Sequence, residues 1–209
     1  KLGTEVYELT DFQAPTVNPE QPESLTAEEE KIISHLLNNF RSSDKLKRHV
    51  EFLQEKGAMY LSYNGNLLIH GCLPLHENGD FKSFTVNKEA HAGRDLLDFF
   101  DQEVRKCLAH PENSTDLATD LMWYLWVGEC SSLFGKTAMT TFERYYIKDK
   151  NTHVEKKNPY YQLREEAEII RKILENFGLD EEGHLVNGHT PIKEKNGENP
   201  IKADGKLIV

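Results

Sequence analysis

The chain has 209 residues, enough for one hydrophobic core or for a core with a smaller second lobe. Its 25 Lys and Arg against 35 Asp and Glu give a formal net charge of -10, which argues against nucleic acid or an anionic membrane as the main partner. The three cysteines are widely spaced and no apolar stretch approaches the roughly 20 residues of a membrane span, so we expect a soluble, cytoplasmic protein.

The N-terminal part predicts a strand remnant, a linker and two helices. Residues 1–24 resemble the second half of a hairpin followed by an extended connector with three prolines. Residues 25–57 predict a helical pair, in which Thr26 and Glu29 form a capping box at the start of the first helix and Gly57 ends the second. Neither end of the chain resembles a domain boundary, so we expect it to be an excerpt of a longer protein.

Residues 58–75 predict core strands and contain the first candidate site residue. A turn at Asn64-Gly65 separates two short runs, and the second, apolar run ends at His70 before Pro74 stops the strand. This pattern places an imidazole at the C-terminal end of a buried strand, where sites gather in open α/β sheets. The alternative is a core histidine that is hydrogen-bonded to a neighbour.

Residues 76–180 predict a largely helical lobe. Apolar residues at helical spacing predict three helices, over residues 93–108, 114–128 and 160–177, with a short strand at residues 81–86. A further helix is expected to begin near Thr137. The aromatic residues of the second helix are expected to pack the lobe core; they are Trp123, Tyr124 and Trp126.

The loop of residues 128–136 combines glycines, hydroxyls and one lysine. Ser131, Ser132 and Lys136 are candidate phosphate ligands, together with the backbone N–H groups of the helix expected to follow. The Gly-Lys pair at its end is not part of a Walker A loop, because the glycine required five residues earlier is missing. The alternative is a solvated lysine on an ordinary loop.

Residues 181–209 predict core strands and repeat the pattern of the first histidine. A short apolar run is followed by Gly188-His189 and then by Pro191. Imidazoles at strand ends suit first-row divalent metals, so His70 and His189 are candidate ligands of one metal site. A two-metal site needs more ligands than these two, and we expect the others upstream of this chain.

Longer stretches of the sequence resemble one known family. LLIHGCLP resembles the strand-His-Gly motif of the metallophosphoesterases related to the Ser/Thr protein phosphatases, and NGHTP resembles their later Gly-His motif. More specifically, the chain is similar to the class III fructose-1,6-bisphosphatases of low-GC Gram-positive bacteria over nearly its whole length. The stretches that carry this similarity are NGNLLIHGCLPL, DLMWYLWVGECSSLFGKTAMTTFERYYI and HLVNGHTPIKEKNGENPIKADGKLIV.

This resemblance implies both a fold and an activity. The implied fold is α/β, the C-terminal part of a calcineurin-like metallophosphoesterase sandwich with a largely helical inserted lobe. The implied activity is a cytoplasmic, metal-dependent hydrolysis of the 1-phosphate of fructose 1,6-bisphosphate in gluconeogenesis, with manganese as the expected metal and magnesium as the alternative. By this similarity His70 and His189 match metal-ligand positions. The superfamily motifs with the other ligands are absent, so the chain by itself is expected to be inactive.

The implied partner is a sugar bisphosphate, whose second phosphate needs a cation of its own. We expect Lys136 to supply that cation, with Arg144 as the second candidate and Ser131 and Ser132 as further ligands. Two other functions stay open from the residues alone. One is a Ser/Thr protein phosphatase-like enzyme, and the other is a non-catalytic protein-binding module that recognises its partner through the aromatic loop.

Overall fold

The computed structural model describes residues 2–209, which divide into two compact units. The first unit comprises the chain up to Gly57 together with Thr140–Val154, and the second comprises Ala58–Met139 and Glu155–Val209. All the strands of the described residues belong to the second unit. No helix in this described part of the chain is long and apolar enough to cross a membrane.

The first unit is built from helices. Helix α1 (Ala27–Arg41) begins with the predicted capping box, in which Thr26 Oγ1 accepts from the N–H of Glu29 and the Glu29 carboxylate accepts from the N–H of Thr26. Helix α2 (Asp44–Lys56) ends at Gly57, as predicted. No residue of α1 or α2 is buried. The unit is completed by α5 (Thr141–Tyr146) and the 3-10 helix η1 (Lys150–His153).

The predicted N-terminal strand is not found in the described residues. Lys1 lies outside them, and from Leu2 onward the segment forms only an isolated bridge between Leu2 and Glu5. The alternating pattern there lacks a neighbouring strand to supply ladder hydrogen bonds, so the local turn satisfies the backbone instead.

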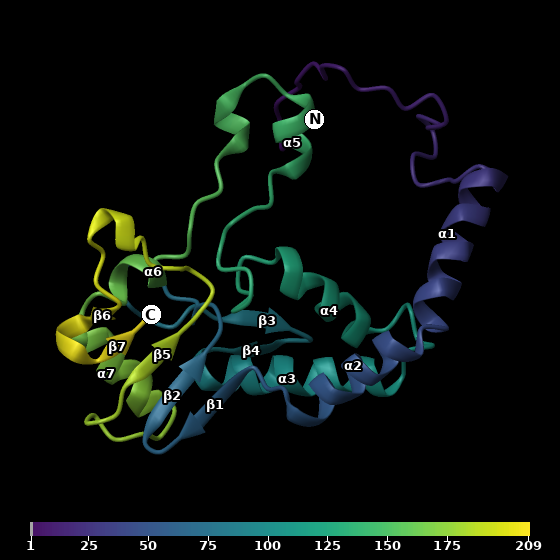
Figure 1. The fold of residues 1–209 in the computed structure, drawn as a ribbon. Coiled ribbons are helices and arrows are strands. Elements are labelled where there is room, and N and C mark those ends of the chain that lie inside the picture. Colours follow the sequence, from purple (N-terminus) through teal and green to yellow (C-terminus); the bar gives the residue numbers. More distant parts are fainter. Residues whose placement is uncertain (1) are drawn as a thin grey trace. The chain divides into compact units, whose positions relative to one another are not determined.

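A five-stranded mixed sheet forms the centre of the second unit (Figure 1). In spatial order its strands are β1 (Tyr60–Tyr63), β2 (Asn66–Ile69), β5 (Leu185–Asn187), β7 (Leu207–Ile208) and β6 (Ile201–Lys202). The hairpin of β1 and β2 is confirmed, whereas β2, β5 and β7 run parallel to one another. The predicted α/β class is therefore correct at the level of a mixed sheet with several helices.

One face of this sheet packs on helices. Alternate residues of the strands point to that face, because side chains alternate along a strand. Helix α7 (Ala167–Asn176) covers them with its own apolar face. The central residues of this core are Leu67, Ile69, Leu185 and Leu207 from the sheet and Ile170, Ile173 and Leu174 from α7. Burying each such side chain contributes about 1.5–3 kcal/mol to stability.

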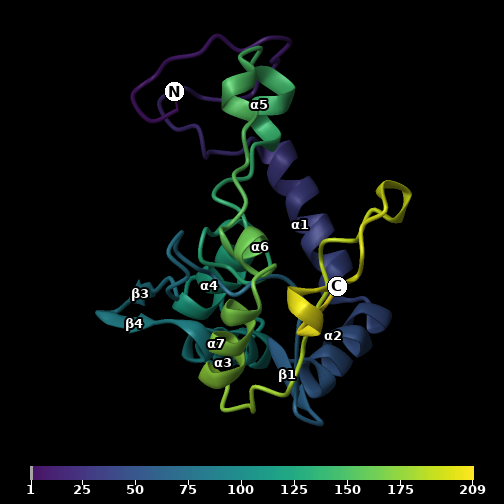
Figure 2. The same cartoon turned by 90° about the vertical axis from the view of Figure 1, so that its left-hand side faces the viewer.

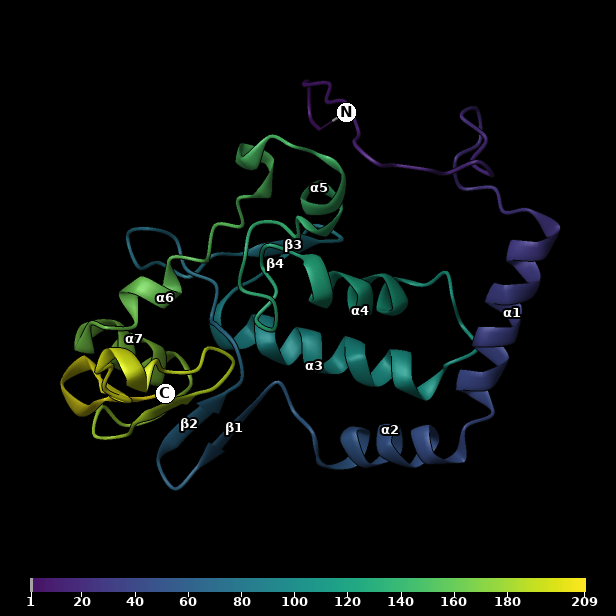
Figure 3. The ribbon, with the colours of Figure 1, turned by 45° about the horizontal axis from the view of Figure 1, so that its top comes forward.

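Two further helices and a small hairpin form the lobe beside the sheet. Helices α3 (Gly93–Ala109) and α4 (Leu117–Val127) lie side by side in Figure 3 and share a cluster that includes Phe100 and Leu121. The hairpin consists of β3 (Phe84–Val86) and β4 (Glu89–His91), and it lies apart from the five-stranded sheet in Figure 2. Short 3-10 helices occur at Glu194–Asn196 (η2) and Ala203–Gly205 (η3).

Three expectations for the lobe are wrong in detail. Helix α4 begins after Asp116, whose carboxylate accepts from the N–H of Thr119, so the cap is Asp116 and not the predicted residue 114 or 115. Only Tyr124 of the three aromatic residues packs against the α3–α4 cluster. Trp123 and Trp126 are 69% and 68% exposed, because they lie on the opposite face of the helix.

Two predicted helices also differ from the structure. The helix expected over residues 160–177 is divided into α6 (Tyr160–Leu163) and α7, and the break directs Arg164 into the interior while α7 covers the sheet. No helix begins near Thr137. Its N–H instead donates to the carbonyl of Lys156 at 2.9 Å, which holds this segment in an extended bridge.

The burial pattern predicts a matched pair of substitutions. Leu174→Ala should cost about 2–5 kcal/mol of unfolding free energy, because Leu174 is fully buried beneath the sheet. Urea unfolding followed by tryptophan fluorescence measures this cost, since both tryptophans lie in the second unit. Leu36→Ala is the control, because Leu36 is 48% exposed in the first unit and should leave that transition unchanged. Equal shifts for both variants would contradict the assigned core.

Candidate functional site

The two candidate histidines meet at one edge of the sheet. Strands β2 and β5 are parallel neighbours, so their C-terminal ends lie together. His70 directly follows β2, and His189 lies two residues beyond β5. Nδ1 of His189 is 3.1 Å from Nε2 of His70, with the ring planes inclined at 78°. Residues that are 119 positions apart in the sequence therefore form one exposed imidazole pair.

The backbone at Gly188 permits this close approach. Its N–H donates to the carbonyl of Ile69 at 3.2 Å, and a Cβ at this position would lie 3.3 Å from the carbonyl oxygen of His70. His189 then adopts a left-handed conformation with φ of 64°. This conformation costs roughly 1 kcal/mol in a residue with a side chain, and it persists only where neighbouring contacts hold it.

Those contacts come from a buried network beneath the histidines. The side-chain oxygen of Asn187 accepts from the Tyr160 hydroxyl at 2.9 Å and from Arg164. Its nitrogen donates to the carbonyls of His70 and Gly71, at 3.1 Å and 2.6 Å. One amide therefore links the end of β5 to the segment that follows β2.

Sequence analysis did not identify Asn187 as a site residue. The available signal was a polar side chain in the buried register of an apolar run, since Leu185 and Asn187 occupy the same face of β5. A buried polar group requires partners, and such a position therefore indicates a network.

Arg164 adds a buried positive charge to this network. The residue is 6% exposed, and its Nη2 donates to the Thr190 hydroxyl at 3.0 Å. The guanidinium also lies over the ring of Tyr161, with its central carbon 5.2 Å from the ring centroid. Among the described residues no carboxylate pairs with Arg164, and its Nε has no hydrogen-bond partner. A buried cation in this condition favours the presence of an anion nearby.

The surroundings of His189 favour its neutral form. Partial burial lowers its pKa below the ordinary value, and the positive charges of His70, Lys136 and Lys157 lower that pKa further. A metal ligand must be a neutral imidazole, so less proton competition opposes metal binding at this residue than at an ordinary histidine.

The imidazole pair fits a shared divalent ion. A metal–imidazole nitrogen bond is about 2.0–2.1 Å long, so two nitrogens at right angles on one ion lie roughly 3 Å apart. The 3.1 Å separation of the two ring nitrogens matches this geometry, and without an ion one ring can donate its N–H to the other. Within residues 2–209 no group of three or more His, Cys, Asp or Glu side chains is placed to hold a metal.

In the loop of residues 128–136, the Ser131 hydroxyl bonds within the chain, whereas the buried Ser132 hydroxyl has no hydrogen-bond partner among the described residues. The Ser131 hydroxyl donates to the carbonyl of Leu125 at 2.6 Å and accepts from two N–H groups of its own loop. Ser132 is 3% exposed, and its carbonyl accepts from the N–H of Cys72 at 2.8 Å. This bond fixes the loop against the segment after His70. The role of Ser131 and Ser132 as substrate ligands stays a prediction.

The two basic candidates lie in different units. Lys136 is half-buried in the second unit and forms an ion pair with Glu155 at 2.6 Å. Arg144 belongs to the first unit, where it donates to the Thr140 hydroxyl and to the carbonyl of His153, each at 3.0 Å. The role of Arg144 at the substrate stays a prediction.

The fold and the site together describe an α/β protein with two imidazoles at the ends of adjacent parallel strands. The model of the family described as Firmicute fructose-1,6-bisphosphatase matches residues 1–209, and the chain belongs to this family. No solved structure matches the chain.

Curated relatives agree with the family assignment. The chain is 99% identical over its full length to the class 3 fructose-1,6-bisphosphatase of Lactococcus lactis subsp. lactis IL1403 and 88% identical to that of subsp. cremoris MG1363. The enzyme of Streptococcus agalactiae serotype V is 56% identical over 98% of the chain. The chain spans about a third of the length of these relatives, covering 33%, 33% and 32% of them.

The network predicts a graded response to substitution. Asn187→Leu should destabilise the second unit by several kcal/mol, because it leaves the Tyr160 hydroxyl and the buried Nη1 of Arg164 without an acceptor, at about 1–3 kcal/mol or more each. Tyr160→Phe removes a single hydrogen bond and should cost about 1 kcal/mol. Urea unfolding of both variants measures the difference. Similar costs for the two substitutions would show that the Asn187 amide does not organise this site.

Proposed function

We propose that this chain supplies two histidine ligands to the metal site of a class 3 fructose-1,6-bisphosphatase. The full-length enzyme then hydrolyses the 1-phosphate of fructose 1,6-bisphosphate to fructose 6-phosphate, as a cytoplasmic enzyme of gluconeogenesis. The family membership supports the reaction. The ligand assignment rests on one observation: Nδ1 of His189 lies 3.1 Å from Nε2 of His70, at the ends of adjacent parallel strands.

The residues of this chain would perform two tasks at such a site. His70 and His189 would bind a divalent ion, manganese or alternatively magnesium, through the two ring nitrogens that face each other. A bound ion would supply Lewis-acid chemistry, polarising a phosphoryl oxygen and acidifying a water molecule. Asn187 would keep both ligand segments in place through its bonds to the carbonyls of His70 and Gly71. The positive charge of Arg164 would favour binding of a phosphate over binding of a neutral ligand.

We also propose that the sheet is one layer of a calcineurin-like sandwich. Five aliphatic residues are cross-strand neighbours on the face opposite α7, one from each strand, and three of them are 41–54% exposed. They are Leu61, Leu68, Val186, Ile208 and Ile201. A continuous apolar row across a sheet is typical of a face that a second layer covers. The remaining two-thirds of the full-length relatives provides polypeptide for such a layer.

The metal assignment predicts a coupled loss in the full-length enzyme. His70→Ala and His189→Ala should each lower metal affinity and turnover together by at least about 100-fold, because each removes a direct metal bond. Isothermal titration with Mn²⁺ and a phosphate-release assay measure the two quantities. His184→Ala is the matched control, because the His184 imidazole lies elsewhere, against the Asn66 side chain. Loss of turnover with unchanged metal affinity would contradict the ligand role.

The proposed sandwich predicts that a charge on this sheet face lowers the free energy of unfolding more in the full-length enzyme than in residues 1–209. Val186→Lys should cost little in residues 1–209, because the side chain is only partly buried there, but several kcal/mol in the full-length enzyme, where a charge would be buried. Thr85→Lys is the control, since Thr85 is exposed on β3, and it should cost little in both. Unfolding free energies of the two chain lengths provide the measurement. An equally small cost of Val186→Lys in the full-length enzyme would exclude a second layer on this face.

A further inference from the structure

A basic pocket lies in the second unit, separate from the imidazole pair. Its volume is about 180 Å³. Four lysines line it, accompanied by two glutamates; the lysines are Lys82, Lys136, Lys156 and Lys157. A concentration of positive charge is unusual in a chain whose formal net charge is -10. The pocket is therefore a local environment that suits an anion.

Two short extended segments bring these lysines together. Lys136 and Lys157 are partners in an antiparallel bridge. The bridge is held by the N–H of Thr137, which donates to the carbonyl of Lys156 at 2.9 Å, and by the N–H of Asn158, which donates to the carbonyl of Gly135 at 3.0 Å. Side chains directly opposite each other in such a bridge point to the same side. Lys136 and Lys157 therefore present their ammonium groups as a pair.

A chain of contacts connects this pair of lysines to the candidate metal site. The Lys157 ammonium lies 5.5 Å from the centroid of the Tyr161 ring, and the central carbon of the Arg164 guanidinium lies 5.2 Å from the same centroid. Arg164 in turn donates to the hydroxyl of Thr190, the residue that follows His189.

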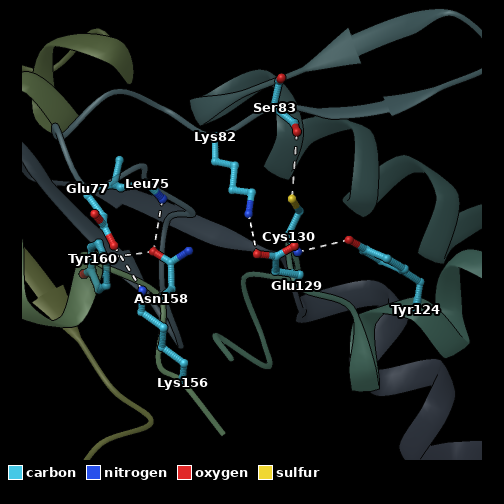
Figure 4. A network of polar contacts seen from close by, with 10 residues as sticks. All are labelled: Leu75, Glu77, Lys82, Ser83, Tyr124, Glu129, Cys130, Lys156, Asn158 and Tyr160. Atoms are coloured by element: carbon cyan, nitrogen blue, oxygen red, sulfur yellow. Dashed lines mark hydrogen bonds and ion pairs between the residues drawn. The ribbon is translucent and has the colours of Figure 1, made fainter. Parts of the chain in front are cut away.

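One lysine of the pocket retains an uncompensated charge. Lys82 pairs with Glu129 and Lys156 pairs with Glu77, as Figure 4 shows, and Lys136 pairs with Glu155. Lys157, in contrast, has no carboxylate partner among residues 2–209. Its ammonium lies 5.5 Å from the centroid of the Tyr161 ring. The pocket thus keeps one positive charge for a ligand.

A buried amide adds a neutral donor. Asn158 is 5% exposed, and its side-chain oxygen accepts from the N–H groups of Leu75 and Tyr160, at 3.1 Å and 2.9 Å. These two bonds fix the orientation of the amide. Its nitrogen consequently points away from them, toward the side of the pocket that Lys82 and Glu129 line (Figure 4). A fixed N–H donor next to cations is the arrangement that phosphate oxygens require.

We infer that this pocket binds a phosphate group through Lys157, Lys136 and Asn158. Building on the proposed function, its occupant is the phosphate of the sugar bisphosphate that is not cleaved. The reacting phosphate would occupy the metal site, so the other phosphate needs a separate cation. Lys157, which has no carboxylate partner among the described residues, provides it, and Lys136 lies opposite it in the bridge. A separate phosphorylated ligand has the same chemistry, and the experiment below distinguishes the two sources.

The test compares two substrates in the full-length class 3 enzyme that carries this segment. Lys157→Ala should raise the KM for fructose 1,6-bisphosphate about tenfold, because it removes one charge-assisted contact, while the KM for p-nitrophenyl phosphate, which has no second phosphate, should change much less. Lys157→Arg should restore most of the affinity. Lys88→Ala is the charge-matched control, since Lys88 is exposed on the turn between β3 and β4 and should alter neither substrate. Equal losses on both substrates would place Lys157 at the reacting phosphate and overturn the assignment.

A second measurement does not depend on catalysis. Inorganic phosphate should protect Lys157 of the full-length enzyme from acetylation, as quantified by mass spectrometry, and should leave Lys88 unprotected. Protection with an unchanged KM in Lys157→Ala would mean that the pocket binds phosphate from a separate ligand, not from the substrate. Absence of protection would show that the pocket does not bind phosphate. If the wild-type enzyme failed to hydrolyse the bisphosphate, the proposed function would fail, and protection would still decide whether the pocket binds phosphate.

Discussion

The site depends on the parallel pairing of β2 with β5 and on the one amide that closes this pairing. Leu67 pairs with Leu185 and Ile69 with Asn187, so the two strands end at the same level. Hydrophobic burial sets this register, because a shift by one residue would expose Leu67 and Leu185. The Asn187 side chain then bonds to the two carbonyls that follow β2. The positions of both histidines are consequences of these contacts, since each imidazole extends from a segment that the amide holds.

The charged side chains around the imidazole pair are mainly positive. The chain as a whole is acidic, but Arg164 is buried beneath the pair, and Lys136 and Lys157 act on His189 from the basic pocket. These cations disfavour an imidazolium and favour an anion, and both effects suit a metal site that receives a phosphate. They also oppose metal binding, because like charges repel. Anionic ligands or a bound phosphate would therefore be required to complete the site, and the unpaired guanidinium of Arg164 is consistent with that requirement.

The sequence predicted the residues that have a local signature and missed those that depend on tertiary contacts. Strand, glycine, histidine and proline are local signals, and from them His70 and His189 could be placed at the ends of strands. Asn187 and Lys157 have no such signature: the first is defined by the partner of β5, and the second by its bridge with Lys136. The helix expected near Thr137 does not form for the same reason: the N–H of Thr137 donates to the carbonyl of Lys156, which lies 19 residues further along the chain.

The open face of the sheet connects the fold to the incomplete site. His70 follows Leu68 by two residues, so strand alternation places it on the side of the exposed aliphatic row and not on the side of α7. A layer that covered this row would therefore end next to His70. That is where the proposed metal site would need its further ligands, since the described residues place only two imidazoles there. Burial of this aliphatic row and completion of the metal site would then be coupled. A substitution that weakened packing at Val186 would therefore also be expected to lower metal affinity.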